Sequence, residues 1–144
     1  MIDLPSLLDW LPRCDSRYAS PFHLAEFVGL LEQAPRSSSR AMVSVPIRHH
    51  KTTTVQCAIS WWLRRDPTLR VVYMTYSGKR AEEVGKDIRD LCRRTGTEPA
   101  KGYDTITNWR NEVGGGVACM SADQSKLGAD VDVLIWDDPI SGPI

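Results

Sequence analysis

The sequence has no long hydrophobic run, and no stretch approaches the roughly 20 consecutive apolar residues that a membrane-spanning helix needs. Its first residues include Asp3 and Asp9, so they lack the basic start of a secretory signal peptide. Both absences favour an intracellular protein that has no membrane partner.

Paired cysteines are also missing. The four cysteines, Cys14, Cys57, Cys92 and Cys119, are widely separated and form no Cys-x-x-Cys motif, so their spacing indicates neither a zinc site nor a disulfide framework. We expect reduced thiols. The chain also has no net charge, because 18 basic residues balance 18 acidic ones. Without an overall basic field, charge neither favours nor excludes a nucleic-acid partner.

No internal repeat, low-complexity tract or evident linker divides the 144 residues, which have an ordinary globular share of 42% hydrophobic residues. This length fits a single domain with a real core. We expect a helical lead-in over residues 1–35, with a short helix around Leu7, Leu8 and Trp10 and another over residues 22–33. The main core would then occupy residues 36–144.

Alternating strand and helix patterns follow the lead-in. Short apolar runs at residues 41–45 and 71–75 are typical of buried strands, whereas residues 55–63 and 81–92 repeat apolar side chains at helical spacing. Trp61 and Trp62 lie on the first of these helices, where core packing is the preferred interpretation over stacking on nucleic-acid bases. Strand, helix, strand, helix predicts an α/β fold with a mainly parallel sheet.

Two further strands are expected at residues 105–112 and 117–120, joined by the permissive turn Gly114-Gly115-Gly116. A last apolar run, residues 133–136, has the pattern of a central strand. It would deliver Asp137 and Asp138 to the carboxyl end of the sheet, where open α/β sheets bind their ligands.

The loop Pro46-Ile47-Arg48-His49-His50-Lys51-Thr52 lies between a predicted strand and a predicted helix. Lys51 and Thr52 stand where a phosphate-binding loop has its lysine and its Mg²⁺-binding hydroxyl, but Val45 and His50 occupy both glycine positions of that pattern. Taken alone, the segment fits a basic turn capped by Thr52 better. The adjacent histidines do not suggest a metal site, because neighbouring side chains diverge on an ordered backbone.

Two interpretations of Asp137 and Asp138 have about equal weight. One is an acidic turn before Pro139, and the other is the acidic strand end of a P-loop enzyme, where the first acid holds Mg²⁺ and the second orients the attacking water. The order of the motifs favours the enzyme. A Lys-Thr loop followed, after further βα elements, by an apolar strand ending in two acids is what a nucleotide-hydrolysing core requires.

Several segments resemble, in the same order, those of phage-type terminase large subunits, the motors that pump DNA into capsids. The loop ending in Lys51-Thr52 is similar to the family's Pro-Pro-Arg-His-Gly-Lys-[Ser/Thr] loop. Other similar segments are Thr75-Tyr76-Ser77, the helix over residues 79–94, Trp109, the three-glycine turn and Leu134-Ile135-Trp136-Asp137-Asp138-Pro139. Together these features cover about residues 18–139, and their joint occurrence is what makes the resemblance specific.

The resemblance implies a three-layer P-loop NTPase core of the ASCE or RecA-like type, incomplete at the C-terminus. It implies ATP and Mg²⁺ as cofactors, with Lys51 on the β/γ-phosphates, Thr52 and Asp137 as Mg²⁺ ligands, and Asp138, together with Lys51, as the catalytic residues. The full set of nucleotide-binding residues would be Tyr18, His23, Arg48, His49, His50, Lys51, Thr52 and Thr53. For Tyr18 and His23, ordinary packing explains the residues at least as well as contact with the adenine.

As a terminase, the protein would work in the host cytoplasm with double-stranded DNA, a portal protein and a small terminase subunit, as a homo-oligomeric ring. The sequence departs from the family at His50, which replaces the loop glycine, and at Ala129, where many members carry an arginine. The alternative hypothesis is therefore a truncated, non-catalytic fragment that serves as an assembly module, or a prophage remnant. A helicase-type ATPase fits the Arg-His before Lys51 and the Asp-Asp-Pro ending less well.

Overall fold

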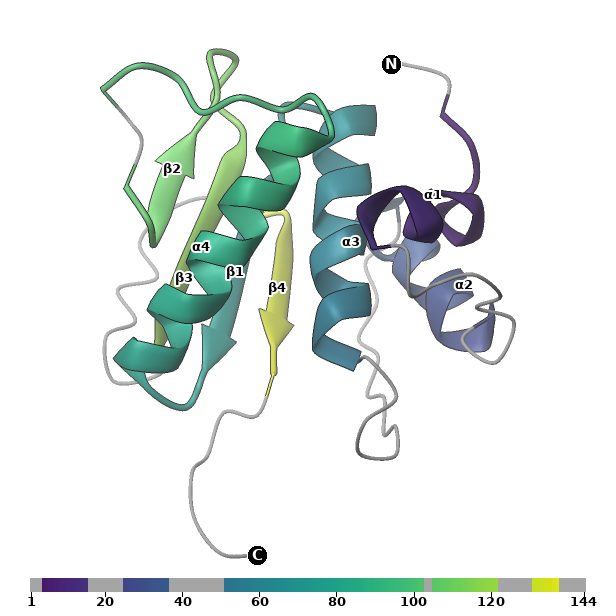
Figure 1. Cartoon of the computed structure of the whole chain (residues 1–144), viewed down its shortest axis with the longest axis horizontal. Helices are drawn as coiled ribbons and strands as arrows, with labels where there is room; N and C mark the ends of the chain where they lie inside the picture. Colours follow the sequence, from purple (N-terminus) through teal and green to yellow (C-terminus); the bar gives the residue numbers. More distant parts are fainter. Residues whose placement is uncertain (1–3, 16–24, 37–50, 103–104, 122–130, 138–144) are drawn as a thin grey trace, which may run out of the picture.

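The computed structural model describes residues 4–15, 25–36, 51–102, 105–121 and 131–137. No helix within these ranges is both long and apolar enough to cross a membrane. The elements, in chain order, are α1 (Leu7–Cys14), α2 (Ala25–Gln33), the short 3-10 helix η2 (Ala34–Arg36), α3 (Lys51–Arg65), β1 (Arg70–Thr75), α4 (Gly78–Arg94), β2 (Asn108–Arg110), β3 (Gly116–Ser121) and β4 (Val133–Trp136) (Figure 1).

The four strands form one sheet in the order β2-β3-β1-β4. β1 is parallel to both β3 and β4, whereas β2 pairs antiparallel with β3. Tyr73, in the middle of β1, lies between Cys119 of β3 and Ile135 of β4. The α/β class and the mainly parallel sheet predicted from the sequence are thus confirmed. Both β1 and β4 end at the same edge of the sheet, so their C-terminal side chains are close neighbours.

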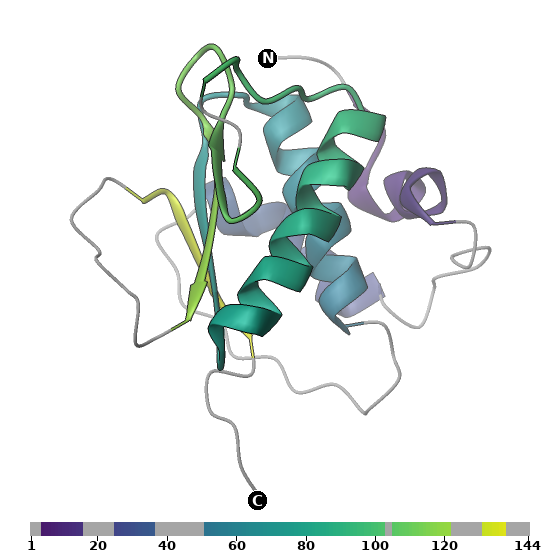
Figure 2. The ribbon, with the colours of Figure 1, turned by 60° about the vertical axis from the view of Figure 1, so that its left-hand side comes forward.

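Helices α3 and α4 cover one face of the sheet, and α1 and α2 lie beyond α3 (Figures 1 and 2). On the other face of β4, Leu134 and Trp136 are 47% and 58% exposed. The sheet and this helical cover supply two of the three layers expected. The third layer and the P-loop NTPase assignment remain predictions.

Helix α3 is buried along most of its length, from Thr54 to Leu63. It is sandwiched, because α4 packs against it on the sheet side while α1 and α2 pack on its far side. Trp61 donates its indole N–H to the Pro5 carbonyl at 2.8 Å, and Trp62 donates to the Leu31 carbonyl at 2.9 Å. Both rings are at most 3% exposed, so the prediction that they pack in the core is confirmed.

The turn between β2 and β3 needs its glycines for two separate reasons. Gly114 has φ +93°, a conformation that side chains strongly disfavour. Gly115 is crowded instead: a Cβ atom there would lie 2.0 Å from the Pro67 carbonyl oxygen. The predicted hairpin is present, because β2 and β3 pair antiparallel. The Asn111 amide joins its turn to the loop before β1 by donating to the Pro67 carbonyl at 2.7 Å.

The predicted strand over residues 105–112 is wrong in extent, because β2 covers only Asn108–Arg110. The Thr105 hydroxyl donates to the Asn108 carbonyl at 2.6 Å and accepts from the Asn108 N–H at 3.0 Å, which makes a local turn before the strand. At the other end, the Asn111 side chain accepts from the Val113 and Gly115 N–H groups. These local bonds form the turns at both ends of β2.

In the lead-in, the predicted short helix is α1, and α2 gives the described part of the helix predicted over residues 22–33. The predicted end of this helix at residue 33 is confirmed, and the 3-10 helix η2 follows it to Arg36. The strand predicted at residues 41–45 lies outside the described residues.

Candidate functional site

The N-terminus of α3 and the carboxyl end of β4 meet at one edge of the sheet. Lys51 and Thr52 are the first two residues of α3, and Asp137 directly follows β4. The Asp137 N–H donates to the Met74 carbonyl at 2.9 Å, which extends the pairing of β4 with β1 by one residue. That bond fixes the backbone from which the carboxylate projects.

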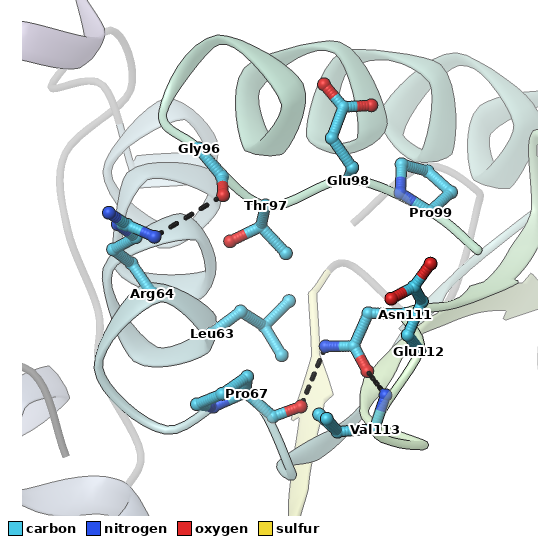
Figure 3. A pocket seen from close by; sticks show the side chains of 10 residues that line it. All are labelled: Leu63, Arg64, Pro67, Gly96, Thr97, Glu98, Pro99, Asn111, Glu112 and Val113. Atoms are coloured by element: carbon cyan, nitrogen blue, oxygen red, sulfur yellow. Dashed lines mark hydrogen bonds between the residues drawn. The ribbon is translucent and has the colours of Figure 1, made fainter.

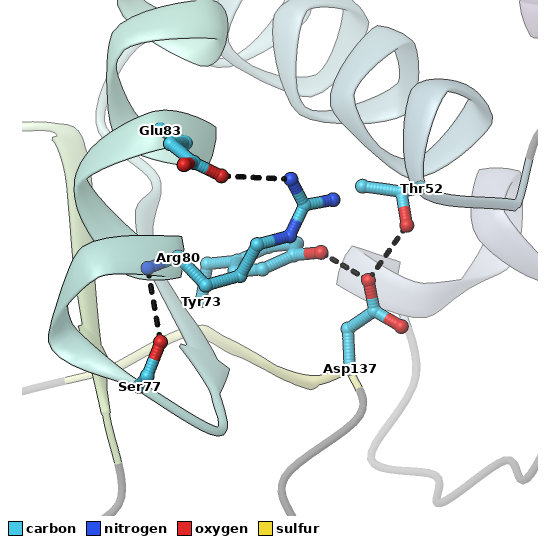
Figure 4. Close-up of polar contacts among 6 residues, drawn as sticks. All are labelled: Thr52, Tyr73, Ser77, Arg80, Glu83 and Asp137. Atoms are coloured by element: carbon cyan, nitrogen blue, oxygen red, sulfur yellow. Dashed lines mark hydrogen bonds and ion pairs between the residues drawn. The ribbon is translucent and has the colours of Figure 1, made fainter. Parts of the chain in front are cut away.

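Three donors converge on the Asp137 carboxylate. The Thr52 hydroxyl donates to Oδ2 at 2.9 Å, and the Lys51 ammonium lies 3.0 Å from Oδ1. The Tyr73 hydroxyl, reaching from β1, also donates to Oδ2 (Figure 4). Residues 85 positions apart in the chain, Thr52 and Asp137, are therefore in direct contact.

Asp137 is buried, with 9% of its surface exposed. Burial by itself opposes ionisation, but the hydrogen bonds from Tyr73, Lys51 and Thr52 and the charge of Lys51 outweigh it, so the pKa of Asp137 is lowered from 3.8. Burial and the bond to Asp137 raise the pKa of Tyr73 far above its ordinary value. At neutral pH the site therefore holds an ionised carboxylate and a protonated phenol.

A further cation, Arg80, stands at the start of α4. The Ser77 hydroxyl caps this helix by accepting from the Arg80 N–H at 3.1 Å, and the Arg80 guanidinium forms a 3.4 Å ion pair with Glu83. Figure 4 shows that guanidinium extending over the Tyr73 ring toward Thr52 and Asp137. Its charge acts to lower the pKa of Tyr73, which opposes the larger effect of burial. Positive charge thus faces the site from α3 and from α4.

These groups fit a magnesium nucleotide. A hydroxyl and a carboxylate oxygen already in contact are the oxygen donors that Mg²⁺ prefers. The first turn of α3 presents backbone N–H groups and the positive end of the helix dipole, which favour phosphate. No group of three or more His, Cys, Asp or Glu side chains suited to a metal occurs in the described part of the chain. Thr52 and Asp137 together offer two side-chain oxygens to such an ion.

Three of the residues predicted from the sequence, Lys51, Thr52 and Asp137, are brought together. Thr53 lies beside them in the first turn of α3, half-buried. Six other predicted site residues lie outside the described residues: Tyr18, His23, Arg48, His49, His50 and Asp138.

Sequence reasoning missed Tyr73 and Arg80. The signal for Tyr73 was a phenol within an otherwise apolar strand, since a buried tyrosine hydroxyl usually has a hydrogen-bond partner. For Arg80 the signal was weaker: a cation in the first turn of a helix that follows a strand of the same sheet.

A hollow of about 350 Å³ lies at the opposite end of the strands, between the C-terminal ends of α3 and α4 and the β2–β3 turn (Figure 3). Two residues that line this hollow are hydrogen-bonded to each other: the Asn111 amide donates to the Pro67 carbonyl at 2.7 Å. None of the predicted site residues lines it. The Asp137 cluster, which gathers three of the predicted residues, is the candidate functional site.

Comparison with protein-family models, curated proteins and solved structures finds no match to this chain. The chemistry of the site thus rests on its own geometry.

Proposed function

We propose that this chain binds Mg²⁺-ATP and hydrolyses it as the ATPase part of a viral terminase motor that moves double-stranded DNA into a procapsid. The observation that carries the proposal is the meeting of Lys51 and Thr52 with Asp137, within 3.0 Å, at the carboxyl end of a mainly parallel sheet. An accidental acidic turn would not require a Lys-Thr helix start to lie against it.

Each residue has a distinct role in this proposal. Thr52 and Asp137 would hold Mg²⁺, and when bound this ion supplies positive charge to the β- and γ-phosphates. Lys51 would exchange its ion pair with Asp137 for the same phosphates, because a flexible ammonium can move between two anions at little cost. Tyr73 keeps the carboxylate ionised and oriented. Asp138, the next residue in the sequence, would orient the attacking water.

The motor function itself is supported by the order of the sequence motifs that resemble terminases. Double-stranded DNA, a portal protein, a small terminase subunit and a ring of identical subunits are the partners that this resemblance proposes. Charge gives no independent support, since the chain has a net charge of zero.

One observation favours the alternative of a non-catalytic assembly module. The Asp137 carboxylate already accepts hydrogen bonds from Thr52 and Tyr73 and forms an ion pair with Lys51. Its oxygens are therefore satisfied without a metal ion. A buried, fully bonded acid of this kind can also be a structural feature that ties α3 to the sheet.

Calorimetric titration of Mg²⁺-ATP into the wild-type chain and into Lys51→Ala distinguishes the two. We expect binding by the wild type and a loss of at least about tenfold in affinity in the variant, because removal of a charge-assisted phosphate contact costs roughly 1.5–3 kcal/mol. The matched control is Lys86→Ala, which removes the same charge from an exposed position on α4.

Equal affinity of the wild type and Lys51→Ala for Mg²⁺-ATP would show that Lys51 does not contact the nucleotide. No binding by either folded protein would favour the assembly module. Binding without turnover would limit the proposal to a nucleotide-binding fragment.

A further inference from the structure

The hollow between the C-terminal ends of α3 and α4 contains a buried hydroxyl group that has no partner. Thr97 lines this hollow and is only 7% exposed. In the part of the chain that the structure describes, its side-chain oxygen forms no hydrogen bond, although its N–H donates to the Cys92 carbonyl at 2.8 Å. Figure 3 shows the Thr97 side chain pointing into the hollow, with its hydroxyl on the side of the Arg64 guanidinium. Because a buried hydroxyl without a partner costs free energy, this side chain needs an explanation.

The end of α4 does not explain it. The Thr97 N–H bonds to the Cys92 carbonyl and the Gly96 N–H bonds to the Arg93 carbonyl at 3.3 Å, and these two bonds form a Schellman motif. Gly96 has φ +99°, as the left-handed position of this motif requires. The residue after that glycine commonly packs an apolar side chain against the last helical turn. Thr97 brings a hydroxyl to this position instead.

Arg64, in the last turn of α3, supplies positive charge to the hollow. One of its N–H groups donates to the Gly96 carbonyl at 3.5 Å, and a Cβ atom at Gly96 would lie 3.3 Å from the Arg64 Cζ atom, so the guanidinium packs against this glycine. Arg64 forms no ion pair with the residues that the structure describes. A guanidinium has five N–H donors in one plane, so most of them remain available to a carboxylate.

The opposite wall of the hollow is the turn between β2 and β3, which side-chain hydrogen bonds hold in place. The Asn111 side chain donates to the Pro67 carbonyl at 2.7 Å and accepts from the Val113 N–H at 3.1 Å. Pro67 and Val113 also offer exposed apolar surface to the hollow. A wall that is already formed lowers the entropic cost of binding a ligand.

The charges differ between the two sides of the hollow. The Glu112 carboxylate lies across the hollow from Arg64 (Figure 3), and among the described residues it forms no ion pair. Glu98 also lines the hollow, but its carboxylate points away from it and pairs with Arg93 at 3.9 Å. A ligand that carries one carboxylate near Arg64 fits this arrangement, whereas a second carboxylate near Glu112 would be repelled.

We propose that this hollow is a binding site, separate from the Asp137 cluster, for a small monocarboxylate with an apolar body. The carboxylate accepts hydrogen bonds from the Arg64 guanidinium and the Thr97 hydroxyl, and the apolar body lies against Pro67 and Val113. The volume of about 350 Å³ falls near the lower end of the range of small-molecule sites, roughly 300–1,000 Å³. For a ligand of about eight non-hydrogen atoms we expect a Kd on the order of 1–10 mM.

The test is a titration of the folded chain with hexanoate at constant pH and ionic strength, followed by the amide signals in ¹⁵N–¹H NMR spectra. We expect saturable shifts centred on Gly96, Thr97 and the turn over residues 111–113. Thr97→Val keeps the shape of the side chain and removes the hydroxyl, and Arg64→Gln removes the charge. Each should weaken binding at least about fivefold, because hydrogen bonds to a charged group are lost.

Arg65→Gln is the matched control. It removes the same charge from the next residue, whose guanidinium lies over the Trp61 ring, 5.1 Å from its centroid, and does not line the hollow. Its affinity for hexanoate should equal that of the wild type. Thr97→Val should also keep the wild-type melting temperature, because the hydroxyl that it removes has no partner in the free chain.

Adipate, which has the same chain length as hexanoate and a second carboxylate, tests the role of Glu112. We expect adipate to bind more weakly than hexanoate, and Glu112→Gln to reduce the difference. Adipate that binds as tightly as hexanoate to the wild type would overturn the assignment to monocarboxylates.

The site itself would be refuted by the absence of saturable shifts, or by shifts centred on Lys51 and Thr52 instead. Equal affinity of the wild type and Thr97→Val for hexanoate would also refute it, and this comparison decides the question even where Arg64→Gln fails to fold. A clearly lower melting temperature of Thr97→Val would contradict the unpartnered hydroxyl on which the proposal rests.

Discussion

The Tyr73 hydroxyl is the contact of the site that can be removed with the least disturbance. Tyr73→Phe keeps the ring in the core and deletes only the donor to Asp137. Because hydrogen bonds to charged groups contribute about 1.5–3 kcal/mol, we expect the free energy of unfolding to fall by about 2 kcal/mol at pH 7. Urea denaturation, monitored by tryptophan emission, measures this free energy of unfolding.

Tyr76→Phe is the control, since Tyr76 directly follows the same strand and is 40% exposed. It should change the unfolding free energy by less than about 0.5 kcal/mol. Equal effects of the two substitutions would show that the Tyr73 hydroxyl contributes nothing specific.

The lowered pKa of Asp137 also predicts how stability depends on pH. The folded state keeps this carboxylate ionised to lower pH than the unfolded chain does, so its contribution is present above the unfolded value of 3.8. It is lost as pH falls through the folded pKa. We therefore expect the stability advantage of the wild type over Asp137→Asn to be greatest near neutral pH and to shrink below about pH 4.

Urea midpoints from pH 7 to pH 3 measure this advantage, with Asp87→Asn, on the exposed side of α4, as the comparison. A difference between wild type and Asp137→Asn that stays constant across this range would mean that ionisation of Asp137 is not coupled to folding.

At the residue level, sequence order was enough to predict that Lys51, Thr52 and Asp137 belong together. It could not predict Tyr73 as their partner, because which face of β1 meets α3 depends on packing. The contact of Cys14 with Ser60 was hidden for the same reason: the two residues stand on helices whose relative placement no local pattern specifies. Spacing alone suggested four isolated thiols.

At the level of elements, the turn between β2 and β3 offers a sharp test of backbone crowding. Gly115→Ala would place a Cβ atom 2.0 Å from the Pro67 oxygen and 2.8 Å from the Leu69 oxygen, both of them backbone atoms that cannot swing aside. We expect a loss of more than about 2 kcal/mol in unfolding free energy, from overpacking and a displaced hairpin. Thermal unfolding by circular dichroism measures it.

Gly29→Ala is the matched control, because nothing lies within 4 Å of a Cβ at that helical position in α2. It should stabilise the protein by about 0.5–1 kcal/mol, since alanine has the higher helix propensity. Similar effects of both substitutions would contradict the crowding at Gly115.

The elements that were predicted best are those in which periodicity and burial agree. In α4, apolar residues at helical spacing form the buried face, and β1 is an apolar run between neighbours on both sides. β2 was overestimated, because side-chain bonds of Thr105 and Asn111 decide its ends. Such bonds depend on which backbone group is within reach, and residue type alone does not specify this.

Over the whole molecule, the sequence predicted the α/β class but not how the N-terminal helices join it. α1 and α2 bury one side of α3, and the Leu7 N–H donates to Glu32 at 2.6 Å between them. The predicted division at residue 35 therefore falls within a continuous packing arrangement: Leu31, before the division, accepts from Trp62, beyond it.

This packing predicts that α1 and α2 unfold together with the sheet. Trp61→Phe removes the bond to the Pro5 carbonyl and part of a ring that is 3% exposed, so we expect a loss of about 1–3 kcal/mol. Far-UV circular dichroism and tryptophan emission should shift together to a lower urea midpoint, because a single cooperative unit gives coincident transitions.

Trp136→Phe is the control: at a ring that is 58% exposed, it should leave the urea midpoint nearly unchanged. Two separated transitions in the Trp61→Phe variant would instead mean that the N-terminal helices form an independent unit, and that α3 keeps its place on the sheet without them.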